Sequence, residues 1–512
     1  MADIQTKQLN TLARGSAYTF VARIVAVGLQ FVYNLMLARY FGAHYTGLFG
    51  FGFSLINLVA LIGLLGTPQT LLRFVAAYRS DGQNKRMFSL LLFALVIGGG
   101  GAVLAMILLW FSVNSIETLS NKPGLGAMLT VFAPIVIPLA IITQISFALQ
   151  GAKRVMESVL IREAGLSLAV LIPLFICWLF TLSFNTFIEL YLLSLLVVGA
   201  VAFLLLYRSF PEIRRVPPIK EWEYQPVWLA SALPLALITA LQSTGGWSDT
   251  IILGFMAPAH EVGAYFVAVR VSLILYTILY AVTAIFSPVA AELWHQQNLS
   301  ELKQAYIATT RWTMMLTMPA ALCMLVASRE FMALFGREFY FGSTILVILV
   351  VGRLANCATG SVGRLLWMTG KERLDMVNII VYLTATIVGI SLIVPYYGAV
   401  GSALVNTFTT ILINALRVWQ VKRILHMHPY DSTYNSTIVA SVVAGLTAWF
   451  VHTLLPVDMG ALLALVTVML TVSITYVATI FAAGLPNEDR KTLQRSYRYF
   501  ASIFLRTSMR PS

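Results

Sequence analysis

Charged residues are scarce in this 512-residue chain: Asp, Glu, Lys and Arg make up 11% of it, whereas 59% of the residues are hydrophobic. A water-soluble globule cannot hide that much apolar surface, and the mean hydropathy is correspondingly high at +0.83. The chain also lacks the series of ~10-residue alternating segments that is typical of a membrane β-barrel. The composition therefore predicts an all-α polytopic membrane protein. Its apolar surface contacts membrane lipid, which is its expected partner.

Residues that commonly hold metals or perform catalysis are few. The three cysteines lie in predicted spans and give neither a disulfide framework nor a metal-binding spacing. The six histidines lie in loops or near span ends, so no buried imidazole cluster is expected. No G-x-x-x-x-G-K-[ST] loop is present, which argues against an ATP-driven pump, and the predicted outside loops are too short for a large external catalytic domain. We expect no enzyme activity, no resident cofactor and no metal.

Apolar stretches of about 20 residues recur along the chain, and each is long enough to cross a ~30 Å hydrocarbon core as a helix. They predict about 14 transmembrane helices, over residues 17–37, 48–72, 88–110, 126–149, 164–182, 188–207, 229–256, 263–291, 306–327, 340–368, 376–395, 398–419, 436–455 and 460–484.

The net charge of +13 follows the predicted topology. If the N-terminus is inside, most of the 34 Lys and Arg residues fall in cytoplasmic segments and their flanks, as the positive-inside rule requires. The outside then holds only Arg39, Lys122, Arg329 and Arg337. We therefore expect a multi-pass protein of the bacterial inner (plasma) membrane with both termini cytoplasmic. The basic C-terminal tail meets an anionic leaflet rather than nucleic acid; its cations are Arg490, Lys491, Arg495 and Arg498.

Two weak internal echoes indicate a repeat. Segment 42–49, which follows the first span, is echoed by 258–265 after the seventh, and segment 150–157 is echoed by 369–376. The two offsets, about 216 and 219 residues, are nearly equal, which predicts two parallel six-helix repeats around a central cavity plus two C-terminal helices. The longest polar connection, Arg208 to Trp228, divides the halves. The predicted domains are an N-terminal lobe over 1–219, a C-terminal lobe over 220–433, two additional spans over 434–484 and a cytoplasmic tail over 485–512.

Polar residues inside spans are the most informative, because a charge there costs about 2.5 to 3.5 kcal/mol on insertion scales and usually faces a cavity. In the first span Arg23, Gln30 and Asn34 are seven and four residues apart, a spacing that places them on one helical stripe. The seventh span repeats this arrangement with Gln242 and Asp249. Each lobe is therefore predicted to present a polar helix face.

The eighth and tenth spans add arginines. Arg270 lies in the eighth, and in the tenth the spacing of Arg353, Gly360 and Arg364 aligns them if the helix is continuous. No catalytic residue is assigned. The candidate substrate-binding residues are Arg23, Gln30, Asn34, Gln242, Asp249, Arg270 and Arg353.

Two interpretations of these charges remain open. In one, they pair among themselves and only orient helices, for example Asp249 with Arg23 or Arg270. In the other, they bind a substrate. Three arginines and one aspartate leave an excess of positive charge, and guanidinium matches the geometry of phosphate. The excess favours an anionic ligand.

Several of these segments resemble the polysaccharide-transporter family, the Wzx-like flippases of the multidrug and oligosaccharidyl-lipid exporter superfamily. The resemblance begins with Arg14-Gly15-Ser16, Phe20 and Arg23. It continues at Leu37-Ala38-Arg39-Tyr40-Phe41-Gly42, Tyr45-Thr46-Gly47-Leu48-Phe49, Gly66 and Leu72-Arg73. In the second half it covers Asp249-Thr250-Ile251-Ile252-Leu253-Gly254 and Val262-Gly263-Ala264-Tyr265.

The resemblance implies fourteen helices in two lobes around a cationic cavity. Such a protein moves a lipid-linked oligosaccharide or polysaccharide repeat unit from the cytoplasmic to the outer leaflet by alternating access. It further implies that Arg23 and Arg270 hold the phosphates of an undecaprenyl-pyrophosphate-linked glycan; Arg353 is added from spacing alone. A second arginine in the first span, typical of lipid II flippases, is missing. A polysaccharide polymerase or glycosyltransferases are potential protein partners.

The main alternative is an ion-coupled multidrug antiporter of the same fold, which would need an acidic cavity to bind cationic compounds. A membrane-embedded transferase would need a His and acid pair, and a scaffold that retains the fold would not depend on the arginines. In the transporter interpretations, Asp249 is a candidate to bind a coupling Na⁺ or proton.

Overall fold

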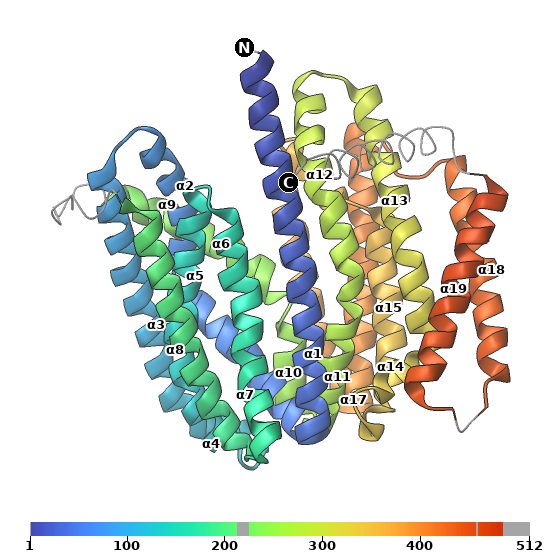
Figure 1. Ribbon diagram of the computed structural model, residues 1–512, viewed down its shortest axis with the longest axis horizontal. Coiled ribbons are helices and arrows are strands. Elements are labelled where there is room, and N and C mark those ends of the chain that lie inside the picture. The colour runs from blue at the N-terminus through green and yellow to red at the C-terminus, as the bar shows by residue number, and fades with distance from the viewer. Residues whose placement is uncertain (1, 212–224, 457–458, 485–512) are drawn as a thin grey trace, which may run out of the picture. The chain divides into compact units, whose positions relative to one another are not determined.

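The structure is a computed structural model that describes residues 2–211, 225–456 and 459–484, with side chains from Ala22 onward apart from those at 233, 238 and 242–244. The described residues form helices and no strand (Figure 1). The polar connection over 212–224 and the basic tail over 485–512 lie outside the described residues. The all-α prediction is confirmed for the described chain.

The chain forms two compact units. Unit 1 comprises Met1–Ile274, Met332–Leu349 and Arg373–Thr409, and unit 2 comprises Leu275–Phe331, Val350–Glu372 and Thr410–Ser512. This division cuts through four helices and does not follow the predicted lobe boundaries, which remain a prediction. The helices wholly or largely in unit 1 are α1 (Ala2–Gly63), α2 (Thr67–Ser80), α3 (Asn84–Ser120), α4 (Leu125–Phe132), α5 (Val136–Gly151), α6 (Val155–Val159), α7 (Leu166–Phe180), α8 (Phe184–Ser209), α9 (Gln225–Thr244), α10 (Ser248–Met256) and α11 (Ala259–Ser272).

Two further helices, α15 (Gly342–Thr359) and α17 (Glu372–Leu425), contribute to both units. The remaining helices lie wholly or largely in unit 2: α12 (Ile274–His295), α13 (Leu299–Val326), α14 (Ser328–Ala333), α16 (Val362–Met368), α18 (Asn435–Leu454) and α19 (Ala461–Ala483). Short turns of 3₁₀ helix over Ala133–Ile135, Arg337–Phe339 and Ser432–Tyr434 complete the described helices, with a π-helix over Leu160–Gly165.

Within the described residues, ten segments are long and apolar enough to span a membrane. Two of them, in α1 and α17, contain a glycine with non-helical dihedral angles where two predicted spans meet: Gly42 (φ 78°, ψ 179°) and Gly398 (φ 52°, ψ −138°). The predicted spans 229–256 and 306–327 correspond to α9 with α10 and to α13, which are not among the ten. The multi-pass architecture is therefore confirmed, and the count of fourteen remains a prediction.

The prediction of one continuous helix through the tenth span is wrong. Gly360 has φ +60°, so α15 ends at Thr359 and α16 starts at Val362. Because the break resets the helical phase, the spacing argument that aligned Arg353 with Arg364 does not hold across it.

The bend at Gly398 is stabilised by a charged cap. Glu261, in the first turn of α11, accepts a hydrogen bond at Oε2 from the Ala399 N–H (2.9 Å). A Cβ at Gly398 would lie 2.2 Å from the same oxygen. The positive φ and the close carboxylate both require glycine here.

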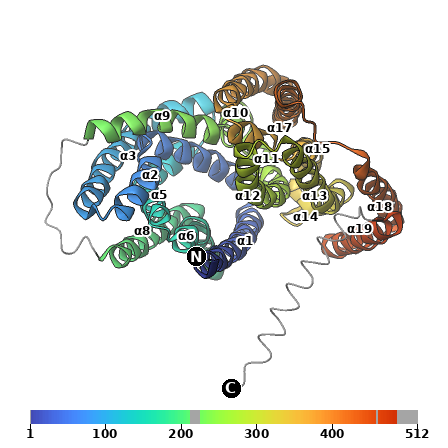
Figure 2. The ribbon, with the colours of Figure 1, turned by 90° about the horizontal axis from the view of Figure 1, so that it is seen from above.

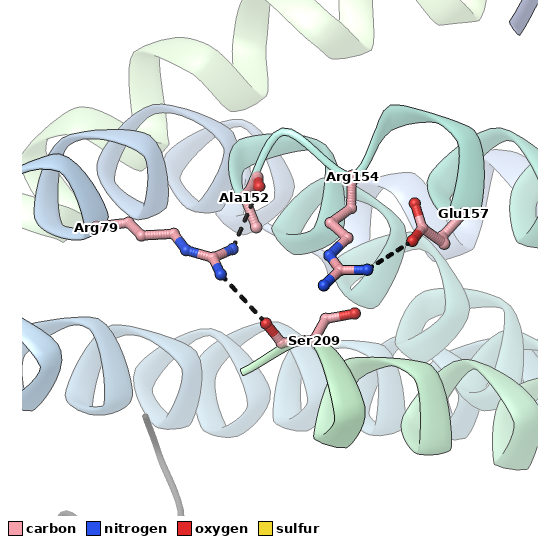
Figure 3. Close-up of polar contacts among 5 residues, drawn as sticks. All are labelled: Arg79, Ala152, Arg154, Glu157 and Ser209. Atoms are coloured by element: carbon pink, nitrogen blue, oxygen red, sulfur yellow. Dashed lines mark hydrogen bonds and ion pairs between the residues drawn. The ribbon is translucent and has the colours of Figure 1, made fainter. Parts of the chain in front are cut away.

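The C-terminal ends of three helices in unit 1 meet at Arg79, in the last turn of α2. Its guanidinium donates to the Ala152 carbonyl after α5 (3.2 Å) and to the Ser209 carbonyl at the end of α8 (3.4 Å), as Figure 3 shows. A cation is stabilised at helix C-termini, where carbonyl groups are unsatisfied. Arg79 thus joins the end of α2 to the ends of α5 and α8, and in the view from above α5 lies beside α2 (Figure 2).

The closest helix crossing in unit 1 joins the second part of α1 to α11. A Cβ added at Gly47 would lie 1.7 Å from the Ala259 carbonyl oxygen, and one added at Gly263 would lie 2.2 Å from the Ala43 carbonyl oxygen. The contact is reciprocal. Ala43 and Gly47, and likewise Ala259 and Gly263, are four residues apart, which is the small-xxx-small pattern of closely packed membrane helices.

Gly47→Ala is expected to lower the thermal stability of the purified protein in detergent, because the methyl group overlaps backbone that cannot rotate away. Overpacking of this kind typically costs about 1–3 kcal/mol. The matched control is Gly99→Ala on α3, where nothing lies within 4 Å of the new Cβ. Equal melting temperatures for the two variants would contradict the crossing.

Lys122, in the connection between α3 and α4, is a buried cation. Its Nζ donates to the Gly254 carbonyl near the end of α10 and lies 5.8 Å from the centre of the Phe51 ring. Burial lowers the pKa of Lys122 from 10.5 to about 8.

Between about pH 8 and 10.5 the unfolded chain therefore holds more protons at Lys122 than the folded protein, so this group makes stability rise with pH over that window. Below pH 8 its contribution is constant. We expect Lys122→Met to flatten the rise in melting temperature between pH 8 and 10.5, measured against the intact protein in the same buffers. Parallel curves would show that the lysine keeps its ordinary pKa.

Candidate functional site

Arg23 on α1 pairs with a residue outside the predicted set. Its Nε lies 3.3 Å from Glu163 Oε1, on the π-helix between α6 and α7. The two side chains are 52% and 30% exposed. Because both side chains are so exposed, this ion pair is weak. Arg23 therefore remains accessible to another anion.

The other two residues of the α1 stripe lie deeper. Asn34 is only 2% exposed, and its Nδ2 donates to the Gln30 backbone carbonyl one turn back (2.7 Å). Its Oδ1 has no hydrogen-bond partner among the described residues. The stripe thus changes from an exposed cation at Arg23 to a buried amide with an unused acceptor at Asn34.

Asp249 lies in the first turn of α10, where a carboxylate is stabilised by the helix dipole. It follows a three-residue break after α9. The carboxylate is 3% exposed and accepts from Tyr265 Oη (2.7 Å), the Thr250 N–H (2.7 Å) and Asn406 Nδ2 (3.2 Å). These donors come from α11, α10 and α17, so one buried carboxylate ties three helices together.

Gln242, which the sequence places seven residues before Asp249, lies in α9, and its side chain is outside the described residues. Its predicted alignment with Asp249 stays a prediction. The break at 245–247 separates the two helices, so helical spacing alone no longer relates them.

Arg270 lies in the last turn of α11, within the apolar segment 259–295. Its guanidinium carbon is 4.8 Å from the centre of the Phe266 ring and 5.5 Å from that of Phe53. Its Nε is buried without a hydrogen-bond partner, and among the described residues it forms no ion pair. Cation–π contacts attract the charge without neutralising it.

Arg353, on α15, belongs to unit 2, whereas the other candidates belong to unit 1. It is 8% exposed and donates from Nη1 to Tyr276 Oη (3.1 Å), with its guanidinium 4.8 Å from the same ring. Asn356 donates to that hydroxyl as well (2.9 Å). Arg353 is thus held by a hydroxyl and an aromatic face.

The structure does not make the ion pairs that the orientation hypothesis suggested for Asp249. Arg23 pairs with Glu163, and Arg270 pairs with no carboxylate in the described part of the chain. Asp249 is satisfied by hydroxyl, amide and backbone donors instead. Within unit 1 the positive charge of Arg270 therefore remains uncompensated by described residues.

Sequence reasoning missed several polar groups of these networks. Glu163 lies just before the start of a predicted span, and Arg311, 3% exposed, lies inside the predicted span 306–327. Arg311 donates to Thr433 Oγ1. Asn406, a polar residue within the predicted span 398–419, offered a signal, whereas Tyr265 and Tyr276 did not, because tyrosine is common in membrane helices.

Comparisons with known proteins give a consistent family. The family model described as "Polysaccharide biosynthesis protein" matches residues 12–294. Two curated relatives come from Haloferax volcanii. The protein named "Probable low-salt glycan biosynthesis flippase Agl15" is 24% identical over 457 residues, covering 85% of this chain and 89% of the relative. "Probable flippase AglR" is 26% identical over 213 residues, covering 41% and 44%.

Solved structures show the same fold. The structure titled "Lipid II flippase MurJ, inward closed conformation" matches with a TM-score of 0.70 at 14% identity, covering 90% of this chain and 97% of that one. An inward-facing multidrug resistance MATE family transporter matches with a TM-score of 0.63 at 14% identity, covering 80% and 98%.

These similarities confirm the family resemblance inferred from the sequence motifs and agree with the polytopic membrane fold predicted from the composition. With the family match extending over more than half of its length, this multi-pass membrane protein belongs to the polysaccharide biosynthesis protein family.

Proposed function

We propose that the protein is a flippase for a lipid-linked oligosaccharide or polysaccharide repeat unit on a polyprenyl pyrophosphate. It moves the headgroup from the cytoplasmic to the outer leaflet of the cell's cytoplasmic membrane. The observation that carries the proposal is Arg270: a guanidinium inside an apolar span, flanked by Phe53 and Phe266 and without a described counter-ion. An unpaired intramembrane cation costs several kcal/mol and indicates an anionic ligand.

Phosphate suits this environment better than a carboxylate-bearing drug or a cationic one. Guanidinium binds phosphate oxygens through charge-assisted, paired hydrogen bonds. Arg270 Nε is buried and has no hydrogen-bond partner among the described residues that a phosphate would need to displace. A cationic drug would instead be repelled by Arg270 and Arg23. The names of the Haloferax relatives, flippases and in one case a glycan biosynthesis flippase, support the same substrate class.

In the proposed transport cycle, the exposed Arg23 and the more deeply buried Arg270 contact the headgroup one after the other. A headgroup meets the half-exposed Arg23 first and then the deeper guanidinium of Arg270, while its prenyl chain stays in lipid. The outward step is alternating access between the lobes predicted from the sequence. An inside-negative potential of ~100 mV drives anions outward, so moving two negative charges out would release about 4.6 kcal/mol, at ~2.3 kcal/mol per charge.

Both termini are proposed to be cytoplasmic, following the distribution of Lys and Arg. With undecaprenyl pyrophosphate as carrier, the membrane would be the bacterial inner membrane. A polymerase or glycosyltransferases that make or consume the lipid-linked glycan are the proposed protein partners.

The test is transfer of a fluorescent polyprenyl-pyrophosphate oligosaccharide across proteoliposomes. We expect intact protein to accelerate transfer and Arg270→Gln to reduce its rate by about tenfold or more, which corresponds to losing one charge-assisted interaction of ~1.5–3 kcal/mol. Arg270→Lys should retain part of the rate, because it keeps the charge but not the planar donor set. Arg208→Gln, at the exposed end of α8, is the matched control.

No transfer by the intact protein over several glycans, together with ion-driven efflux of a cationic dye, would overturn the proposal in favour of a multidrug antiporter. Equal rates for intact protein and Arg270→Gln would reject the role of Arg270.

Asp249 is the proposed site of any coupling ion. Its oxygens accept from Tyr265 and Asn406. The hydroxyl oxygens of Ser248 on α10 and Ser402 on α17 are also buried, without a hydrogen-bond partner among the described residues. Oxygen-rich surroundings of this kind suit Na⁺ or a proton.

We expect an imposed Na⁺ or pH gradient to stimulate transfer by the intact protein and not by Asp249→Asn, measured with the membrane potential clamped by K⁺ and valinomycin. Thr143→Val, which removes a hydroxyl on α5 that donates only to the Leu139 carbonyl of its own helix (2.8 Å), is the control. Stimulation that survives in Asp249→Asn would place the coupling site elsewhere.

A further inference from the structure

The span between Val155 and Phe180 contains an irregular turn. Residues Leu160–Gly165 form a π-helix between α6 and α7. The wider i→i+5 turn is rare, and where it occurs it often lies at a functional site. This turn contains adjacent residues of opposite charge, Arg162 and Glu163, ahead of the apolar run that begins at Leu166.

The two charged side chains interact with two different helices of unit 1. Glu163 Oε1 lies 3.3 Å from Arg23 Nε on α1. The guanidinium of Arg162 lies 5.0 Å from the centre of the Phe147 ring on α5. Arg162 also interacts electrostatically with both Glu163 and Arg23. Both guanidinium groups therefore lie within electrostatic range of the Glu163 carboxylate.

This arrangement has one positive charge more than it can neutralise. The Arg162 side chain is exposed, and within the described residues its guanidinium makes no hydrogen bond that would occupy its five donors. Arg154, which directly precedes α6, differs because it has its own carboxylate: Arg154 Nη1 lies 3.0 Å from Glu157 Oε1 (Figure 3). Arg162 is held by an aromatic face and keeps its donors available.

We propose that Arg23, Arg162 and Glu163 form an exchange subsite for a pyrophosphate group, in which the phosphates replace Glu163 as the partner of Arg23 and recruit Arg162 as a second guanidinium. The subsite rests on the proposed function and names the part of the substrate that it takes. A pyrophosphate presents several anionic oxygens, so it satisfies both arginines at once, which the single carboxylate of Glu163 does not.

Glu163 has two effects in this subsite. Without ligand it neutralises Arg23, which would otherwise attract any cytoplasmic anion. With ligand bound, its negative charge lies next to the phosphates and weakens their binding, which helps release. Displacing the carboxylate is feasible because it is already 30% exposed and becomes hydrated when Arg23 leaves it.

The test measures binding of farnesyl pyrophosphate to the full-length protein in phosphatidylcholine nanodiscs. We expect Arg162→Gln to raise the Kd by roughly tenfold, and Arg162→Lys to restore part of the affinity. We expect Glu163→Gln to lower the Kd several-fold and yet to slow transfer in proteoliposomes, because tighter binding delays release. A purely structural role for Glu163 would not produce tighter binding with slower turnover.

Arg154→Gln is the matched control: it removes one cation near the same end of the same span and is expected to leave the Kd unchanged. An equal loss of affinity in Arg154→Gln and Arg162→Gln would show that binding depends only on general surface charge, and it would overturn the subsite. An unchanged Kd in both Arg162→Gln and Glu163→Gln would overturn it as well.

Two further measurements distinguish which phosphate-bearing molecule the subsite binds. Competition by inorganic pyrophosphate, at concentrations near those of the farnesyl compound, would show that the headgroup alone is recognised. Loss of affinity when phosphatidylglycerol is added to the nanodiscs would assign the site to phospholipid headgroups and overturn its assignment to a lipid pyrophosphate. If the intact protein transfers substrate while Arg162 and Glu163 have no effect, only the subsite fails. If the intact protein transfers none, the proposed function fails whatever the arginines bind.

Discussion

The close crossing of α1 and α11 is the contact on which the rest of unit 1 depends. At Gly47 and Gly263 the two backbones approach so closely that either Cβ would lie within about 2 Å of a carbonyl oxygen of the other helix. In lipid no hydrophobic driving force brings helices together, so close packing between small residues has to supply it. The crossing fixes where Phe53 and Phe266 lie, and their rings in turn hold the guanidinium of Arg270.

The segments that meet at this crossing are the same two that echo each other in the sequence, 42–49 and 258–265. Ala43 and Gly47 occupy positions in the first segment that Ala259 and Gly263 occupy in the second, and each glycine faces the alanine carbonyl of the other helix. Equivalent residues in reciprocal contact are the pattern of a pseudo-twofold interface. A single substitution at either glycine therefore disturbs a contact that both segments share.

The polar groups within the spans fall into two classes, according to whether their hydrogen-bonding atoms are occupied by other residues. Asp249 and Arg353 are buried and surrounded by hydroxyl and amide partners, which is how a membrane protein meets the cost of an internal charge. Arg23, Arg162 and Arg270 are left with exposed or unused donors. The first group holds helices in place, and the second group is available to a ligand, which is why the proposed phosphate contacts are assigned to it.

The sequence by itself determined the fold class, the membrane location and the family, because hydrophobic length, charge placement and short motifs are local properties of the chain. It also selected Arg23, Asp249, Arg270 and Arg353, since a charge within an apolar run stands out without any structure.

Only the tertiary structure decided which partner each charge has. Glu163 and Arg162 lay at the edge of a predicted span and looked interfacial, and the tyrosines beside Asp249 and Arg353 looked like ordinary membrane residues. The break at Gly360 likewise undid an alignment that spacing had favoured, because a single residue with positive φ changes the helical phase of everything after it. Periodicity places residues on a face of one helix, but packing between helices decides what that face meets.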